Sequence, residues 1–93
     1  MRPSKIHPGV HLRELLKEHG ISQSHLARHL KTKIGAINEV CNGKRGISVQ
    51  LAQRLALAFG SSVEFWLNLQ MAYDLGRAAK PLKISRIVGS RAA

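Results

Sequence analysis

Polar side chains that can form hydrogen bonds with nucleic acid are concentrated just before the middle of the chain. Lys33, Asn38 and Glu39 lie on the polar side of a predicted helix. An asparagine amide can pair with N6 and N7 of adenine, and a lysine can bind guanine or a phosphate. Lys44 and Arg45 follow in a short basic loop, and cations in such loops hold backbone phosphates without reading sequence. These residue types, in this order, predict a DNA-binding surface.

Further contacts are expected on either side of these residues. Ile34 or Ala36 can touch a thymine methyl group, and Gly35 allows close backbone approach. Gln23 is placed for a backbone phosphate, and Glu39 either reads cytosine or forms an ion pair. The predicted DNA contacts are Gln23, Thr32, Lys33, Ile34, Gly35, Ala36, Asn38, Glu39, Lys44 and Arg45.

A helix-turn-helix positions these side chains. In the stretch SQSHLARHLKTKIGAINEVCNGKR, Ser22 is a good N-cap, and the small Ala27 lets two helices cross closely. Thr32 closes the turn and can cap the next helix. Ile37 and Val40 point into the core from that helix, which leaves its other side free. The second helix of such a motif lies in the major groove.

The apolar periodicity and the caps predict an all-α helix-turn-helix domain over residues 1–79, followed by a basic tail over residues 80–93. The tail contains Pro81 and several apolar residues, so we expect a short strand, packing along the surface, or a flexible segment. The five predicted helices span about residues 8–19, 23–30, 33–41, 49–59 and 62–77.

The last helix, in EFWLNLQMAYDL, carries too many apolar side chains for one buried stripe. In so short a chain, the second apolar side is expected to meet a partner subunit. The predicted dimer contacts are Phe65, Trp66, Leu69 and Tyr73. Stacking of Trp66 or Tyr73 on bases is the less favoured alternative.

The composition limits the partners. Fifteen Lys and Arg against five Asp and Glu give this 93-residue chain a formal net charge of +10, which favours a polyanion. No apolar run approaches the ~20 residues of a membrane span, and the N-terminus lacks the apolar segment of a secretory signal. The single cysteine suits a reducing compartment. We therefore expect a cytoplasmic, nucleoid-associated protein without membrane contact.

Other chemistry has weaker support. His25 and His29 have zinc-compatible spacing, but two further ligands are not apparent. Cys41 on the inner side of a helix behaves as a small apolar residue. A small basic nuclease that uses His25 or His29 lacks acid–base partners. We predict no catalytic residues, no metal and no cofactor.

The strings HPG, ISQSHLA, INEVCNGKRGIS and EFWLNLQMAYDL together resemble the HigA family of addiction-module antitoxins, which belongs to the phage-repressor-like, XRE-type helix-turn-helix group. The resemblance covers about residues 6–77. It implies a five-helix homodimer that binds an inverted repeat in its own promoter. It also implies a non-catalytic antitoxin that neutralises a HigB-type toxin, a ribosome-dependent mRNA endonuclease. A stand-alone regulator without a toxin is the alternative.

The chain departs from the family pattern in its turn and its recognition helix. Lys31 stands where relatives often have glycine, and a left-handed lysine costs about 1 kcal/mol. KIG at residues 33–35 replaces Pro-Pro-Ser, so base specificity cannot be transferred from relatives. Leu16 and Cys41 stand where many phage-type repressors have an Arg–Glu ion pair. An apolar contact can replace such a buried pair without loss of stability. A basic toxin would have to bind through shape or through Glu14, Glu18 and apolar surface near the first helix.

Overall fold

The computed structural model describes residues 1–78 and 81–89, and this part of the chain contains helices and no strands. The all-α prediction is confirmed, and each predicted boundary lies within one residue of the observed one. The helices are α1 (Pro8–His19), α2 (Gln23–Leu30), α3 (Ile34–Cys41), α4 (Val49–Phe59) and α5 (Val63–Arg77).

Local signals fix most helix ends. Ser22, Ser48 and Ser62 each accept a hydrogen bond at their Oγ from the backbone N–H three residues on, at 3.0–3.1 Å. Gly20 and Gly60 end α1 and α4 in the left-handed conformation, with φ of 64° and 70°. These residues provide the side-chain acceptors and the positive φ values that helix ends require.

The start of α3 differs from the prediction. Thr32 does not cap this helix; the N-cap is Lys33, whose side chain makes no capping hydrogen bond. The backbone N–H of Thr32 instead donates to the carbonyl of Ala27 at 2.9 Å. Thr32 therefore belongs to the end of α2, which moves the start of α3 one residue along the chain.

Lys31 adopts the left-handed conformation, with φ 56° and ψ 45°. It is the one non-glycine residue with positive φ among the described residues. Arg54 of α4 donates from Nη1 to the carbonyls of Leu30 and Lys31, at 3.0 and 3.2 Å. These bonds satisfy carbonyls left free at the end of α2 and offset part of the backbone strain.

Lys31→Gly should therefore stabilise the domain by about 1 kcal/mol, because glycine has no Cβ to clash in this conformation. Thermal unfolding should show a midpoint raised by about 4–8 °C. Gly60→Lys is the matched control, since no atom lies within 4 Å of a Cβ built there and only the backbone is strained. The control should lower the midpoint by a similar amount. An unchanged midpoint for Lys31→Gly would show that Lys31 is not strained.

One core joins all five helices, with Trp66 of α5 fully buried at 0% exposure. Its Nε1 donates to Ser61 Oγ at 2.9 Å, so its one polar atom is satisfied. Leu16 and Cys41 both lie in this core, as expected from the apolar replacement of an ion pair. The other core residues are Leu12, Leu26, Ala27, Leu30, Ile37, Val40, Ile47, Ala52, Leu55 and Ala56.

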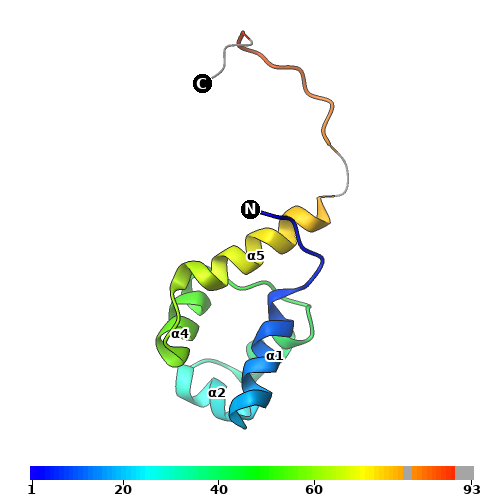
Figure 1. Cartoon of the computed structure of the whole chain (residues 1–93). Coiled ribbons are helices and arrows are strands. Elements are labelled where there is room, and N and C mark those ends of the chain that lie inside the picture. Colours follow the sequence, from blue (N-terminus) through cyan, green and yellow to red (C-terminus); the bar gives the residue numbers. More distant parts are fainter. Residues whose placement is uncertain (79–80, 90–93) are drawn as a thin grey trace.

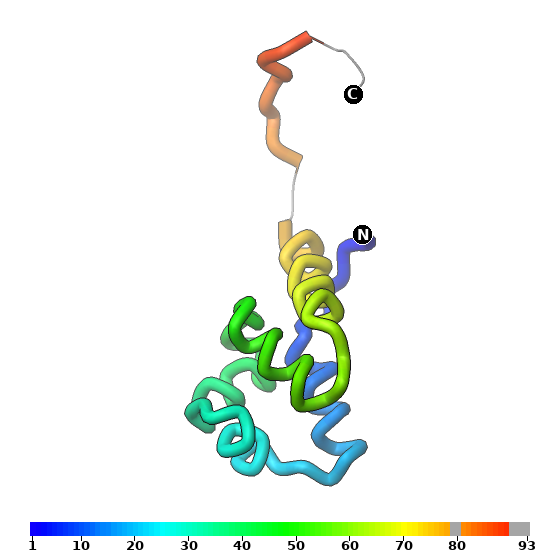
Figure 2. Tube along the Cα trace, turned by 90° about the vertical axis from the view of Figure 1, so that its left-hand side faces the viewer, coloured from blue at the N-terminus to red at the C-terminus, as the bar shows by residue number. Residues whose placement is uncertain are grey.

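The N-terminal segment lies along α5, as Figures 1 and 2 show from two directions. Ser4 donates from its backbone N–H to the carbonyl of Ala72 at 2.8 Å. Gly76 permits this approach, because a Cβ there would clash with the Ser4 carbonyl.

The tail over residues 81–89 extends away from the helices, and its side chains are exposed (Figure 1). It does not form the short strand or the surface packing considered above. Lys80 and Arg91, which the sequence groups with this tail, lie outside the described residues. Within the described ranges, no helix has both the length and the apolarity to cross a membrane.

Candidate nucleic-acid interface

α3 presents an open outer side. Ile37 and Val40 are fully buried and fix which side of the helix faces outward. On that outer side Ile34 is 52% exposed, and a Cβ at Gly35 would meet no atom within 4 Å. Asn38 is exposed further along the same side. An exposed isoleucine, an open glycine and an amide form a surface suited to thymine methyls and base edges.

Three amide side chains are linked across this surface. Asn42 donates from Nδ2 to Asn38 Oδ1 at 3.1 Å. Asn38 in turn donates from Nδ2 to Oε1 of Gln23, the first residue of α2, at 3.2 Å. The structure thus brings two predicted contact residues together and adds Asn42, which is not among the predicted DNA contacts.

Glu39 and Arg45 form an ion pair, with Arg45 Nη2 3.0 Å from Glu39 Oε1. This observation favours the ion-pair alternative for Glu39 over cytosine reading in the DNA-free protein. Both side chains are about half exposed, so the pair stabilises the fold little. Its effect is to hold the Arg45 guanidinium beside α3. Lys44 is exposed next to it.

The basic loop is attached to α5 by Gln70. Gln70 Oε1 accepts from the backbone N–H of Ile47 at 2.7 Å, while its Nε2 donates to Asp74 Oδ1 at 2.9 Å. Ile47 is itself in the core. Because these contacts lie far apart in sequence, the sequence alone did not indicate that the loop is held from α5.

His7 supports the same region. Its Nδ1 accepts from the backbone N–H of Gly9 at 2.9 Å and caps α1. Its ring packs edge-on against Tyr73 of α5, with centroids 4.8 Å apart. Burial lowers the pKa of His7, and a contact with the Arg45 backbone opposes this shift. The neutral imidazole is thus favoured, which keeps Nδ1 available as an acceptor.

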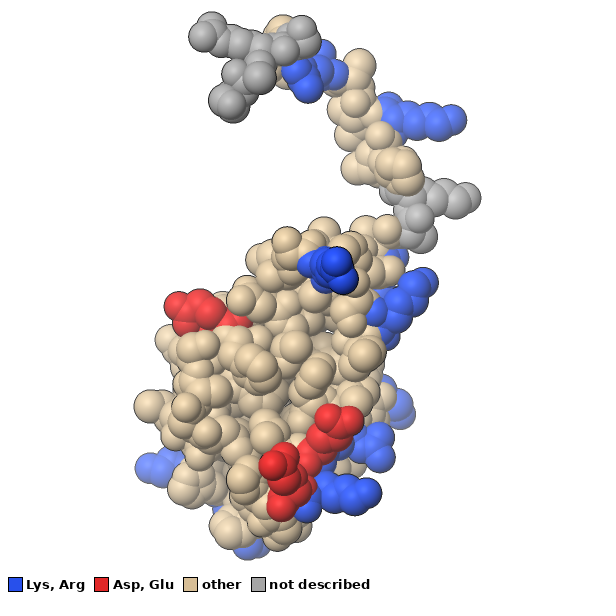
Figure 3. Space-filling model, viewed as in Figure 1, with Lys and Arg blue, Asp and Glu red and all other residues tan. Residues whose placement is uncertain are grey.

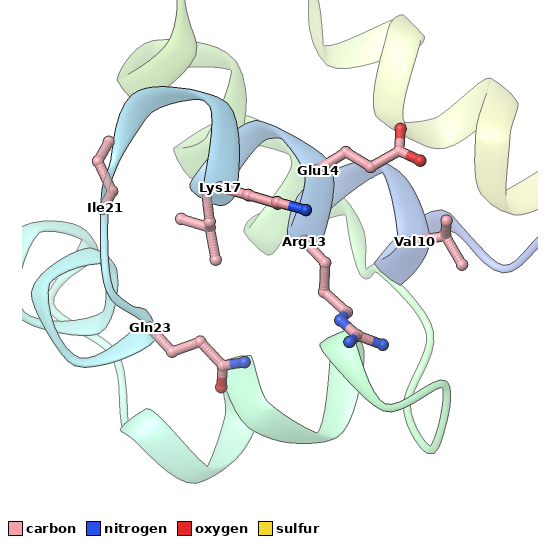
Figure 4. Close-up of a pocket in the computed structure, with 7 residues that line it drawn as sticks. Val10, Arg13, Glu14, Lys17, Ile21 and Gln23 are labelled. Atoms are coloured by element: carbon pink, nitrogen blue, oxygen red, sulfur yellow. The ribbon is translucent and has the colours of Figure 1, made fainter.

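A groove between α1 and α2 adds two cations that are not among the predicted DNA contacts. Arg13 and Lys17 of α1 line it together with Gln23 (Figure 4). In the same view the Glu14 carboxylate points away from the Arg13 guanidinium. Neither cation forms an ion pair within the described residues. The sequence did not indicate these two cations, because their position depends on how closely α1 approaches the start of α2 in the folded chain.

Charge is distributed unevenly over the helices. Figure 3 shows Lys and Arg projecting mainly along the lower and right-hand edges, whereas the central area of this view is largely uncharged. Two small acidic patches lie on the same face. The excess of positive charge is therefore concentrated away from the middle of this face.

The predicted dimer contacts have different environments. Trp66 belongs to the monomer core, so its assignment to a dimer interface is wrong. The sequence did not reveal that Trp66 is a core residue, because apolar residues flank it and α5 therefore shows no single apolar stripe. Leu69 and Tyr73 are half-buried, and Phe65 is 43% exposed. Met71 and Leu75, 53% and 45% exposed, lie one turn apart on the outer side of α5, at a different angle around the helix from Phe65.

The histidines and the cysteine fit structural roles. In the described part of the chain, no group of three or more His, Cys, Asp or Glu side chains is arranged to hold a metal ion. His25 and His29 instead border an apolar pocket beside Phe59. Burial raises the pKa of the Cys41 thiol, which disfavours the thiolate that nucleophilic chemistry requires.

The close pair α2 and α3, the exposed outer side of α3 and the adjoining basic loop define a helix-turn-helix protein. A family model described as helix-turn-helix matches residues 12–66. The chain is 42% identical over 84 residues to virulence-associated protein I of Dichelobacter nodosus, covering 89% of this chain and 78% of that protein.

Two solved structures are similar over most of the chain. An addiction module antidote protein of a HigA family from Coxiella burnetii is 46% identical, with a TM-score of 0.74 over 84% of each chain. The antitoxin HigA of Pseudomonas aeruginosa, solved with the higBA promoter, is 45% identical. Its TM-score is 0.78, over 81% of this chain and 83% of that chain. The chain belongs to the helix-turn-helix family and, within it, to the HigA family of antitoxins.

Proposed function

We propose that this protein is the antitoxin of a toxin–antitoxin module and a dimeric repressor of its own operon. The observation that carries the proposal is the exposed outer side of α3, flanked by the Gln23 amide and by Lys44 and Arg45. Membership in the HigA family supports this function, and a HigA relative was solved with promoter DNA. The protein is a binding module and not an enzyme, and it acts on DNA in the cytoplasm.

The proposed contacts fall into two groups. Lys33, Ile34, Gly35, Ala36 and Asn38 read base edges. Backbone phosphates are held by Gln23, Thr32, Lys44 and Arg45, joined by Arg13 and Lys17 from the groove beside α1. Arg45 exchanges Glu39 for a phosphate when DNA binds, because both partners of that pair are exposed.

Asn38→Ala and Lys44→Ala should separate the two groups. Asn38→Ala should cost ~1–3 kcal/mol at one base pair of the operator and leave binding to random DNA unchanged. Lys44→Ala should weaken all sequences alike and reduce the slope of log K against log salt by about 1. Fluorescence anisotropy over a salt series measures both effects. Equal losses on operator and random DNA for both variants would contradict this division.

The dimer forms through the outer side of α5, where Met71 and Leu75 lie one turn apart and Phe65 lies further around the helix, at the edge of this side. Leu69 and Tyr73 contribute from its edges. Two recognition helices then lie about 34 Å apart, one turn of DNA, and contact an inverted repeat. The exposed apolar residues support this arrangement, since an apolar helical side gains by association.

The toxin, a HigB-type mRNA endonuclease, binds the face that carries Glu14 and Glu18 on α1. This face suits a basic partner better than the strongly positive remainder of the surface. Co-expression with the adjacent open reading frame, followed by affinity purification, tests the assignment. Recovery of a small basic protein whose toxicity is neutralised supports an antitoxin. Operator binding without such a partner would leave the alternative, a stand-alone regulator.

A further inference from the structure

We infer that Asn42 is a positioning residue that sets the base preference of Asn38 through the amide chain Asn42–Asn38–Gln23. The inference rests on the proposed DNA-binding function and adds to it a determinant outside the base-reading residues. Asn42 is the C-cap of α3, with φ −92° and ψ 6°, and is exposed.

The direction of the two hydrogen bonds carries the inference. Asn42 donates to Asn38 Oδ1 at 3.1 Å, and Asn38 donates from Nδ2 to Gln23 Oε1 at 3.2 Å. An isolated asparagine amide can rotate by 180° and exchange its donor and acceptor. In this chain a rotation of Asn38 alone would set two donors against each other on one side and two acceptors on the other. The amide chain therefore couples the orientation of Asn38 to that of Gln23. In the proposed complex the Gln23 amide nitrogen donates to a phosphate, which leaves Oε1 for Asn38.

In this orientation, Asn38 keeps available the hydrogen-bonding atoms that adenine requires. An amide oxygen accepts two hydrogen bonds and an amide nitrogen donates two, and the chain uses one of each. Asn38 thus retains one acceptor site on Oδ1 and one donor on Nδ2. Adenine presents a donor at N6 and an acceptor at N7, which is the complementary pair. The reversed amide would face adenine with like groups opposed.

Free asparagine side chains lose rotational freedom when they bind a base, which lowers affinity and selectivity. Here the two neighbours restrain the Asn38 side chain before DNA arrives, from opposite ends of the motif. Gln23 begins α2 and Asn42 ends α3. The reading side chain is therefore positioned by both helices of the helix-turn-helix.

The test uses an operator library in which each base pair is replaced in turn. The base pair read by Asn38 is the one whose preference disappears in Asn38→Ala. Asn42→Ala should reduce adenine preference at that same pair by about fivefold, the worth of one orienting hydrogen bond, without changing preferences elsewhere. Gln23→Ala should affect the same pair and provides a second variant if Asn42→Ala is unstable. Gln53→Ala, an exposed amide on α4, is the control and should change no preference.

Asn42→Asp gives the sharper readout, because a carboxylate only accepts and therefore favours the reversed amide of Asn38. We expect it to abolish adenine preference at that pair, beyond the uniform weakening that its charge causes on all duplexes. A uniform loss over all base pairs for Asn42→Ala and Asn42→Asp, with specific binding by the parent protein intact, would overturn this inference alone. Absence of specific binding by the parent protein would overturn it together with the proposed function.

Discussion

Replacing Trp66 with alanine should destabilise the domain by about 3–5 kcal/mol, a large part of the total stability of a domain this size. The side chain is fully buried and contacts Phe59 and Phe65, with ring centroids 6.3 and 5.1 Å away. Its removal leaves a cavity at the junction of α4 and α5 and an unpaired Ser61 hydroxyl. Chemical denaturation followed by circular dichroism measures the loss.

Phe65→Ala is the matched control, because Phe65 lies next in sequence but is 43% exposed. It should cost much less unfolding free energy while weakening self-association. If Trp66→Ala instead left monomer stability unchanged and abolished only the dimer, the assignment of Trp66 to the core would be wrong. The two neighbouring aromatic residues therefore separate folding from assembly.

Met71→Glu should convert the dimer to a monomer and lower operator affinity by about 10²–10⁴-fold. The loss is large because linked half-sites bind with a high effective concentration that a monomer lacks. A charge buried at an apolar interface also costs several kcal/mol unless it is paired. Met71 is 53% exposed in the single chain, so the fold itself should tolerate the change. Sedimentation equilibrium and anisotropy on the same samples report mass and affinity.

Leu57→Glu on α4 provides the charge-matched control, since Leu57 is an exposed apolar residue outside α5. It changes the net charge by the same amount and should leave the mass and most of the operator affinity intact. A dimeric Met71→Glu variant with parental affinity would exclude the outer side of α5 as the interface.

The sequence predicted well the parts of the fold that depend on local chemistry. Ser22 and Ser48 cap helices and Gly20 ends one, because caps and positive φ values depend on a few adjacent atoms. The role of Lys33 as N-cap of α3 was missed and given to Thr32, since the left-handed Lys31 and the Thr32 backbone bond shift that boundary by one residue. The sequence also could not show how the fold accommodates a left-handed Lys31, because this involves hydrogen bonds from Arg54 on a distant helix.

The candidate site was likewise predictable only where it depends on residues close together in the sequence. Residues on the outer side of α3 were identified from the inward periodicity of Ile37 and Val40. The amide chain was not, because Asn42 and Gln23 come together only when α2 and α3 pack. The groove cations Arg13 and Lys17 were missed for the same reason. Trp66 was misassigned because α5 is apolar on several sides, and periodicity does not say which side meets its own core.

Binding to the DNA directly upstream of the protein's own gene tests the central proposal most directly. A mobility-shift titration at several salt concentrations, combined with footprinting, gives affinity, symmetry and salt dependence together. We expect two protected half-sites one helical turn apart, bound by a dimer at least about 10³-fold more tightly than random DNA of equal length. Equal affinity for upstream and random DNA, or protection without two-fold symmetry, would contradict the proposal that the protein is a dimeric autorepressor.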